Sequence, residues 1–249
     1  MKSAAYFISD AHLGITMPGH DDRQKRLLSF LDEIEDCAEA LYIVGDLFDF
    51  WIEYRHAIRP DYVAVVSRLA GLVESGVKIH YLAGNHDFAL GPFLQDTVGL
   101  RIHLDHFETT IQGKKVHLFH GDGVVKKDVG YRILKRILRN RLNQRLYKLL
   151  HPDIGVPLAS FFSGNSRKML ADWITEEKLE EYRRCARKLL EGSDIVIFGH
   201  THRPELRRYG DKVYVNTGEW IRKYTFAKME NGTIGLWEWF PDRQAEEMR

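Results

Sequence analysis

The chain has 249 residues, 44% of them apolar, which is enough to bury the core of one large α/β domain or two small ones and argues against disorder. Its 36 lysine and arginine residues balance 35 aspartate and glutamate residues, so the net charge gives no reason to expect binding to nucleic acid or membranes. The only cysteines, Cys37 and Cys185, are far apart, which argues against a disulfide framework or a thiolate zinc site.

The first residues enter a strand-like run and lack the apolar stretch and cleavage site of a signal peptide, so we expect a cytoplasmic protein. No apolar run reaches the roughly 20 residues that a membrane-spanning helix needs. Contact with a membrane is therefore expected only at its surface.

Short apolar runs that end in small or polar residues predict strands along the chain. Five of them precede residue 200, at 4–9, 40–45, 77–84, 115–120 and 194–199. Residues 21–40 and 61–75 have apolar residues at helical spacing, and three more strands are predicted at 212–216, 225–230 and 232–240. Alternating strands and helices predict an α/β layered fold in which mixed β-sheets stack and are flanked by helices.

Residues 130–151 interrupt this alternation with a helical, amphipathic pattern. Residues 126–148 contain nine lysine or arginine residues and one acid, Asp128. Breaks are predicted at Pro152 and Pro157, and another helix at 176–190. We interpret 123–192 as a helical lid inserted into a single domain that spans 1–249.

A basic amphipathic helix can lie on an anionic membrane, or it can close over acyl chains while its cations meet phosphates. The alternative is a helix that packs on the domain with its basic face in solvent.

Side chains that can bind metal follow each of the first five predicted strands. The clusters are Asp10-Ala11-His12, Gly45-Asp46-Leu47-Phe48-Asp49, Gly84-Asn85-His86-Asp87, His120-Gly121-Asp122 and Gly199-His200-Thr201-His202. One such cluster is more often a hydrogen-bonded turn than a pair of ligands. Five in succession indicate a shared site, because the carboxyl ends of strands in α/β sheets converge on one crevice.

The ligand types favour two divalent ions such as Mn, Fe, Co or Zn, because carboxylate, imidazole and amide groups occur without thiolates. The candidate ligands are Asp10, His12, Asp46, Asn85, His120, His200 and His202. Seven are too many for one ion that also holds water and substrate. A carboxylate such as Asp46 can bridge two ions about 3.5 to 4 Å apart, the spacing that suits in-line displacement at a phosphate.

Residues beside these ligands have two possible roles each. The glycines at 45, 84, 121 and 199 suit turns where the backbone approaches metal or phosphate closely, although ordinary strand-end turns explain them equally well. Asp49, Asp87 and Asp122 are placed to orient metal-binding imidazoles, with surface or capping roles as the alternative.

Together the five clusters resemble the complete motif set of the calcineurin-like metallophosphoesterases, over residues 8–202. The resemblance implies that Asp10, His12, Asp46 and His202 hold one metal, and that Asp46, Asn85, His120 and His200 hold the other. It further implies that His86 is not a ligand, but acts with Asp46 and Asn85 in catalysis by stabilising the transferring phosphate or protonating the leaving group.

Within this family, the strings around Asp10, Asp46 and His200 are similar to the branch that hydrolyses the pyrophosphate of UDP-2,3-diacylglucosamine in lipid A biosynthesis, typically with manganese. This implies a lipid-sugar nucleotide as substrate and a place at the inner face of a membrane, with no nucleic acid and no obligate protein partner. The implied substrate contacts are Asn85, His86, His200 and the lid residues Asp128, Asn165 and Ser166.

Two other functions stay open. The same chemistry could act on another phosphodiester, a nucleotide or a phosphomonoester. A non-catalytic scaffold with this fold is disfavoured, because such a protein usually loses ligands and none of the seven is missing.

Overall fold

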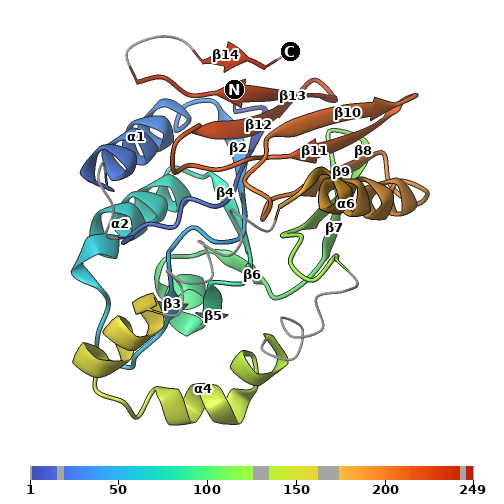
Figure 1. Cartoon of the computed structure of the whole chain (residues 1–249). Coiled ribbons are helices and arrows are strands. Elements are labelled where there is room, and N and C mark those ends of the chain that lie inside the picture. The colour runs from blue at the N-terminus through green and yellow to red at the C-terminus, as the bar shows by residue number, and fades with distance from the viewer. Residues whose placement is uncertain (1, 16–19, 126–134, 162–173, 242–244, 249) are drawn as a thin grey trace.

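Two β-sheets lie face to face between outer helices in a computed structural model of the chain (Figure 1). The structure describes residues 2–15, 20–125, 135–161, 174–241 and 245–248. Helices α1 (His20–Glu33) and α2 (Pro60–Glu74) cover one outer face, and α6 (Glu176–Leu189) covers the other. The predicted α/β fold with stacked mixed sheets is confirmed.

The larger sheet has seven strands in the order β14-β13-β12-β1-β2-β4-β6. Strands β1, β2, β4 and β6 run parallel, and β12 pairs antiparallel with β1. The bounds are β1 Ala4–Ile8, β2 Ala38–Val44, β4 Lys78–Leu82, β6 Arg101–His103, β12 Thr225–Glu230, β13 Thr233–Glu238 and β14 Glu246–Glu247.

The second sheet has five strands in the order β10-β11-β9-β8-β7, with β8, β9 and β11 parallel and an antiparallel strand at each edge. Its bounds are β7 Phe107–Ile111, β8 Lys114–Phe119, β9 Ile195–Phe198, β10 Glu205–Tyr209 and β11 Lys212–Asn216. Two short strands, β3 (Trp51–Ile52) and β5 (Asp87–Ala89), form a small separate sheet, and a π-helical turn, η1, spans Phe93–Thr97.

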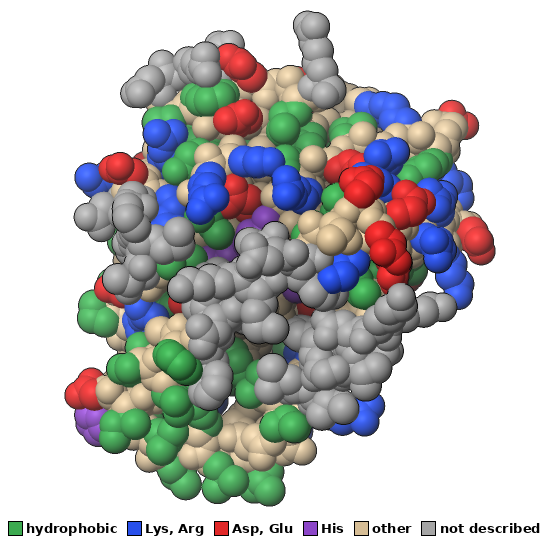
Figure 2. Space-filling view, in the orientation of Figure 1, with side chains coloured by type: hydrophobic (Ala, Val, Ile, Leu, Met, Phe, Trp, Pro, Cys, Tyr) green, Lys and Arg blue, Asp and Glu red, His purple; other side chains and the backbone are tan. Residues whose placement is uncertain are grey.

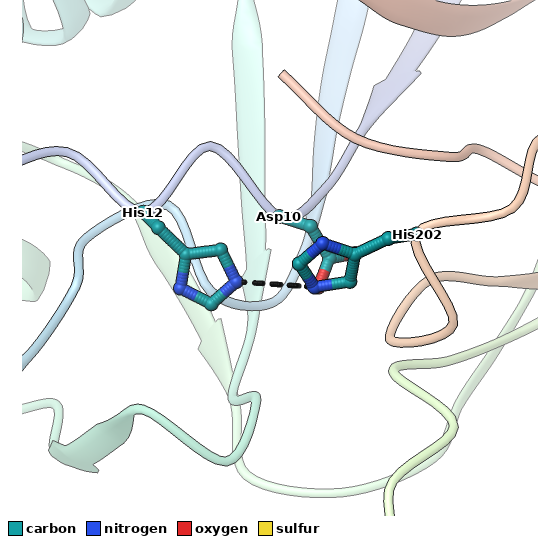
Figure 3. Close-up of side chains that lie close together, drawn as sticks. All are labelled: Asp10, His12 and His202. Carbon is teal, nitrogen blue, oxygen red and sulfur yellow. Dashed lines mark hydrogen bonds and ion pairs between the residues drawn. The ribbon is translucent and has the colours of Figure 1, made fainter. Parts of the chain in front are cut away.

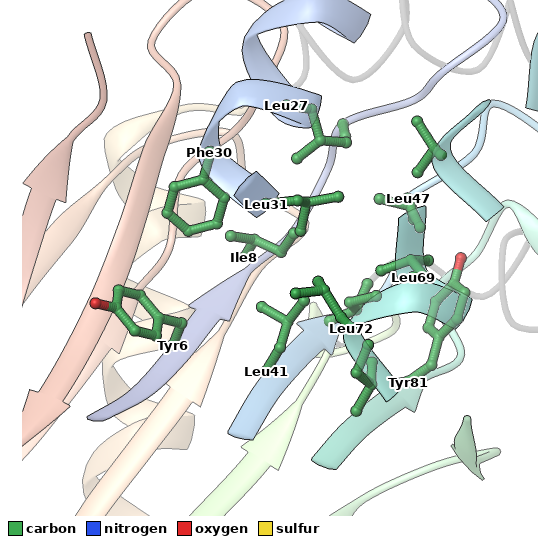
Figure 4. Packing of buried hydrophobic residues seen from close by; sticks show 14 of the residues in the cluster. Tyr6, Ile8, Leu27, Phe30, Leu31, Leu41, Leu47, Leu69, Leu72 and Tyr81 are labelled. Carbon is green, nitrogen blue, oxygen red and sulfur yellow. The ribbon is translucent and has the colours of Figure 1, made fainter. Parts of the chain in front are cut away.

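Strand β1 is buried on both faces, which explains why its sequence is apolar throughout. Tyr6 and Ile8 face α1 and α2 in one core cluster (Figure 4), whereas Phe7 faces the second sheet in another. Because successive side chains of a strand alternate between faces, a strand covered on both faces needs an unbroken apolar run. A third cluster, which includes Tyr182 and Ala186, packs α6 against the second sheet.

The predicted strands match observed strands to within two residues at each end, and the predicted helix at 61–75 is confirmed as α2. The helix predicted at 21–40 was too long, because α1 ends at Glu33 and Ala38 already pairs with Ala4 of β1. Strand pairing at this position outweighs the local helical pattern. The missed strands β3, β5, β6 and β14 have two or three residues each, which leaves little periodicity to detect. The missed strands β7 and β10 are edge strands whose residues are mostly polar and at least partly exposed, so they lack an apolar run.

The single helix predicted at 130–151 is wrong in its described part. Residues 135–138 are helical, the chain then breaks, and Asn140 begins α4 (Arg141–Tyr147) by accepting hydrogen bonds from the backbone N–H groups of the next turn. Pro152 does not break a helix but starts one, at 152–161, because proline is tolerated in the first turn.

The helical residues 135–161 lie beyond β3 and β5, away from the two main sheets (Figure 1). Helix α6, by contrast, belongs to the predicted lid range but packs on the second sheet. Within the described residues, no helix is both long and apolar enough to cross a bilayer.

Replacing His80 should make the stability of the fold less dependent on pH. Burial, together with the nearby His103 and Arg101, lowers the pKa of His80 from 6.5 to about 4. Between these values the unfolded chain binds the proton and the folded chain does not, so the contribution of His80 to stability is full above pH 6.5 and is lost as the pH falls toward 4.

The unaltered protein should lose unfolding free energy as the pH falls from 6.5 to 4. We expect this loss to be smaller in His80→Phe by up to about 3 kcal/mol, measured by urea titration at several pH values. The ring of Phe preserves stacking on Tyr42. The exposed His151 serves as control in His151→Phe, which should leave the unfolding free energy at pH 7 nearly unchanged. An unchanged pH dependence in His80→Phe would contradict the assignment.

Candidate metal centre

The seven predicted ligands lie at the carboxyl ends of five strands drawn from both sheets. Asp10 and His12 follow β1, Asp46 follows β2, Asn85 follows β4, His120 follows β8, and His200 and His202 follow β9. Backbone hydrogen bonds fix neighbouring loops to each other, including Asp10 N–H to the Gly45 carbonyl at 3.1 Å and Gly199 N–H to the His120 carbonyl at 3.0 Å. The parallel arrangement thus brings distant parts of the sequence together at one edge.

One group of side chains surrounds Asp10 (Figure 3). Its Oδ1 atom lies 3.3 Å from Nε2 of His202 and 3.7 Å from Nε2 of His12, and the two imidazole nitrogens are 3.4 Å apart. These three residues form one cluster that could hold a metal ion.

A second group surrounds Asp46. Its Oδ2 atom lies 3.2 Å from Nε2 of His120, and that nitrogen is 3.0 Å from Oδ1 of Asn85. His200 completes this group. The same Oδ2 atom is 3.9 Å from Nε2 of His12, so Asp46 lies between the two groups, as a bridging ligand would.

The hydrogen-bonding pattern of His120 fits a cation. Its Nδ1 lies 2.7 Å from the Val44 carbonyl, which can only accept, so Nδ1 carries a proton and Nε2 is the nitrogen that faces the oxygens of Asp46 and Asn85. A cation bound there would replace the Nε2 proton and use its lone pair. Among the described residues, the buried Oδ1 of Asp10 has no hydrogen-bond donor. Converging acceptors without donors are costly in a buried site, and divalent cations would satisfy them.

The charges of the site also favour a bound cation. Burial lowers the pKa of His12 to about 3 and that of His200 to about 4, so both imidazoles are neutral near pH 7 and have a lone pair for a metal. For His120, burial is outweighed by the carboxylates of Asp46 and Asp10, which raise its pKa to about 10. The raised pKa reflects an excess of buried negative charge that a cation would neutralise.

The backbone is strained at the same residues. Eight non-glycine residues in the described part of the chain have positive φ, and five of them are predicted ligands. They are Asp10 (53°), His12 (43°), Asp46 (54°), His200 (67°) and His202 (55°). Left-handed conformations of such residues cost about 1 to 3 kcal/mol each and cluster at functional sites.

The glycines beside the ligands allow the close approach that their positions predicted. A Cβ on Gly45 would lie 2.3 Å from Nδ1 of His120, and one on Gly199 would lie 2.7 Å from Oδ2 of Asp10. For Gly121 the nearest atoms are 3.4 Å away, so its φ of 109° rather than crowding requires glycine.

Gly84→Ala should weaken metal binding at least about tenfold, because the new Cβ would lie 2.1 Å from Oδ1 of Asp46 and displace that carboxylate. Equilibrium dialysis against Mn²⁺ measures the effect. Gly71→Ala is the matched control, since a Cβ there would meet only the Arg68 side chain at 3.6 Å. Equal manganese affinity of the two variants would show that Gly84 does not shape the site.

One of the three aspartates predicted to orient imidazoles contacts backbone groups instead. Asp87 does not orient an imidazole: its carboxylate accepts from the backbone N–H groups of Asp46 and Gly84 at 3.0 and 2.8 Å. His86 Nδ1 donates to the Asp49 backbone carbonyl at 2.8 Å. The partners in these three hydrogen bonds are backbone groups, so residue type in the sequence could not reveal them.

Two cations from the basic stretch also reach the site and were not singled out from the sequence. Lys135 Nζ lies 2.5 Å from the fully buried carboxylate of Asp122, and Arg139 donates to the Gly84 carbonyl at 3.2 Å. Burial would raise the pKa of Asp122, but the charges of His120 and Lys135 outweigh it and hold that pKa at about 2. The predicted substrate contacts Asp128, Asn165 and Ser166 lie outside the described residues.

This combination of a layered α/β fold and a carboxylate and imidazole cluster at the strand ends is that of a metal-dependent hydrolase acting on phosphate esters or anhydrides. The calcineurin-like phosphoesterase family matches residues 5–204, a range that contains all seven predicted ligands. The chain therefore belongs to the calcineurin-like phosphoesterases, which use divalent metal ions.

Similar proteins of known name cover nearly the whole chain. A UDP-2,3-diacylglucosamine hydrolase of Porphyromonas gingivalis is 32% identical, over 95% of this chain and 97% of its own. One from Haemophilus influenzae is 28% identical, over 93% and 98%. Among solved structures, a Vps29 double mutant from Entamoeba histolytica is 16% identical with a TM-score of 0.48, over 98% of both chains.

Proposed function

We propose that this protein hydrolyses the pyrophosphate of UDP-2,3-diacylglucosamine to UMP and 2,3-diacylglucosamine 1-phosphate, using two divalent ions, most favourably Mn²⁺. The observation that carries the proposal is the complete set of seven ligands at one crevice, in a chain 32% identical over 95% of its length to a hydrolase named for that substrate. Oxygen and nitrogen ligands without thiolates suit manganese.

We assign Asp10, His12, Asp46 and His202 to one ion and Asp46, Asn85, His120 and His200 to the other. Ions held there would polarise the phosphoryl oxygens and activate water for in-line attack. Oδ2 of Asp46 faces ligands of both groups, so it would be the atom shared by two ions held there. The imidazoles of His12 and His200, neutral because of their burial, contribute lone pairs without adding charge.

His86 is assigned to the substrate rather than to a metal. Its Nδ1 is engaged by the Asp49 carbonyl, so Nε2 is the nitrogen that can serve the phosphate. Its ring lies 4.6 Å from that of His12, edge to face, beside the proposed metal pair. Burial lowers the pKa of His86, whereas the negative charge of a bound phosphate would favour its protonated form. In that form Nε2–H can stabilise charge on the transferring phosphate or supply a proton to the leaving oxygen.

A cavity whose wall includes β3, the strand that pairs with β5 after His86, would take the apolar part of such a substrate. It measures about 740 Å³ and lies between the 50–62 segment and helical residues 152–157. Phe50, Trp51 and Tyr54 are among its walls, and Trp51 N–H donates to the His86 carbonyl at 3.0 Å. His86 and the seven ligands do not line the cavity, so we propose that only the apolar part of the substrate occupies it, under helices that act as the described part of a lid.

The outer surface of these helices would contact the membrane that contains the lipid. Figure 2 shows apolar side chains gathered at the end of the molecule where Figure 1 places α4. The exposed ones include Leu142, Leu146 and Leu149, and Arg145 and Lys148 are exposed beside them. Exposed leucines among cations are the composition of a helix that lies in the surface of an anionic bilayer.

Leu149→Glu should reduce binding to vesicles of phosphatidylethanolamine and phosphatidylglycerol at least about tenfold, because Leu149 is 81% exposed on that surface and a carboxylate both resists burial and repels anionic lipid. Sedimentation with the vesicles measures this. Val63→Glu, on α2, is the control and should sediment like the unaltered protein. Undiminished sedimentation of Leu149→Glu would remove this surface from the proposal.

The substrate itself is tested with purified protein, Mn²⁺ and UDP-2,3-diacylglucosamine, following UMP by chromatography. Release of UMP with the lipid phosphate as the second product is the expected result. Hydrolysis of a chromogenic phosphodiester without turnover of the lipid nucleotide would be consistent with the proposed metal centre but would contradict the proposed substrate.

A further inference from the structure

The two oxygens of Asp10 have different surroundings. Oδ2 accepts from Oγ of Ser9 at 2.5 Å and from the backbone N–H of His200 at 2.8 Å. Oδ1 accepts no hydrogen bond among the described residues and faces the nitrogens of His12 and His202. Only Oδ1 is thus left for a metal.

A second hydroxyl lies behind Ser9. Thr217 Oγ1 is 2.7 Å from Ser9 Oγ, and both residues are at most 1% exposed. Oδ2 of Asp10 already accepts from the His200 backbone N–H group, and the Ser9 hydroxyl is a second donor to the same oxygen. Because Ser9 donates its one proton to Asp10, the contact with Thr217 is a hydrogen bond when Thr217 donates to Ser9 at 2.7 Å rather than to the Phe198 carbonyl at 3.3 Å. Such a chain of hydrogen bonds polarises each member in the same direction.

The position of Thr217 is itself fixed. It directly follows β11 of the second sheet, whereas Ser9 directly follows β1 of the first, so the hydrogen bond between them joins the two sheets behind Asp10. Thr225 Oγ1 donates to the Thr217 carbonyl at 2.7 Å. The buried carboxylate of Glu219 accepts the backbone N–H groups of Ile221, Arg222 and Lys223, which holds the connecting loop in one conformation.

We propose that Ser9 and Thr217 are positioning residues that hold Asp10 as a one-oxygen metal ligand by occupying its Oδ2. The inference rests on the proposed metal centre. With Oδ2 engaged, the carboxylate cannot rotate to offer both oxygens, and its negative charge is directed at the ion shared with His12 and His202. Gly199 leaves the space for this arrangement, because a Cβ there would lie 2.6 Å from Ser9 Oγ.

The test is manganese binding to metal-free protein in the absence of substrate, measured by isothermal titration. Ser9→Ala and Thr217→Val each remove one hydroxyl with little change in volume, and we expect one of the two binding steps to weaken about 10- to 100-fold while the other is unchanged. The double variant should be no weaker than Ser9→Ala alone, because both changes break one chain of hydrogen bonds.

Two controls separate positioning from a general effect on folding. Thr217→Ser keeps the hydroxyl and should bind manganese like the unaltered protein. Ser193→Ala removes the hydroxyl of another buried serine, outside the metal centre, and should also have no effect. Thermal unfolding of each metal-free variant shows whether the fold is intact.

Normal affinity in folded Ser9→Ala would overturn the inference while leaving the metal centre in place. Equal weakening in Thr217→Ser and Thr217→Val would also overturn it, since the hydroxyl would then not matter. Absence of manganese binding by the unaltered protein would instead reject the proposed metal centre, so the two failures can be told apart.

Discussion

Asp46→Asn should lower turnover by more than about 10³-fold and reduce bound manganese from two ions per chain to one or none. Oδ2 of Asp46 faces His120 at 3.2 Å and His12 at 3.9 Å, so this single atom serves both groups of ligands. Oδ1 accepts the backbone N–H of His86 at 2.8 Å. An asparagine would keep its oxygen on that N–H group and turn its NH₂ group, which cannot bind a cation, toward the ions.

The measurement combines hydrolysis rates with metal content after gel filtration. Asp105→Asn, which neutralises a largely exposed aspartate, should retain full turnover and two ions. Two tightly bound ions in Asp46→Asn would show that this residue does not bridge the metals.

His86→Ala should retain both ions and slow hydrolysis by about 10² to 10⁴, the usual range for loss of a general acid. The contact of residue 86 with Asp46 is made by its backbone N–H group, which alanine keeps, so the bridging carboxylate should stay in place. Only the imidazole that serves the phosphate is removed. The variant therefore separates chemistry from metal binding, which Asp46→Asn cannot do.

His151→Ala, at an exposed histidine, is the control for His86→Ala and should be fully active. The effect should appear in the rate at saturating substrate, measured with the same metal content in all samples. Full activity of His86→Ala would refute its catalytic role, and loss of one ion would make it a ligand, which its place beside His12 and Asp46 allows geometrically.

The fold was largely predictable because its central strands are covered on both faces. An unbroken run such as 4–8 has few alternatives to a buried strand when polar residues follow it at once. The local sequence pattern could not show which of two elements forms where a helix and a strand are both compatible with it. Residues 38–40 continue the helical pattern of α1, and only their pairing with β1 decides that they form a strand.

The ligands of the site could be predicted because strand ends in parallel sheets converge, which turns five weak clusters into one strong signal. The structural features that position these ligands could not be predicted from the sequence. Positive φ at Asp10 and His200 has no signature in the residue type, and the Ser9–Thr217 contact joins residues 208 positions apart. Lys135 was visible only as one of nine cations in a basic stretch, and its pairing with Asp122 depends on the tertiary structure.

The central claim, that seven side chains from five strand ends hold two cations bridged by Asp46, is tested most directly by anomalous diffraction from manganese-soaked crystals. We predict two peaks within bonding distance of Asp46, one also beside Asp10 and His202 and the other beside Asn85 and His120. A single peak, or peaks that do not share Asp46, would contradict the account.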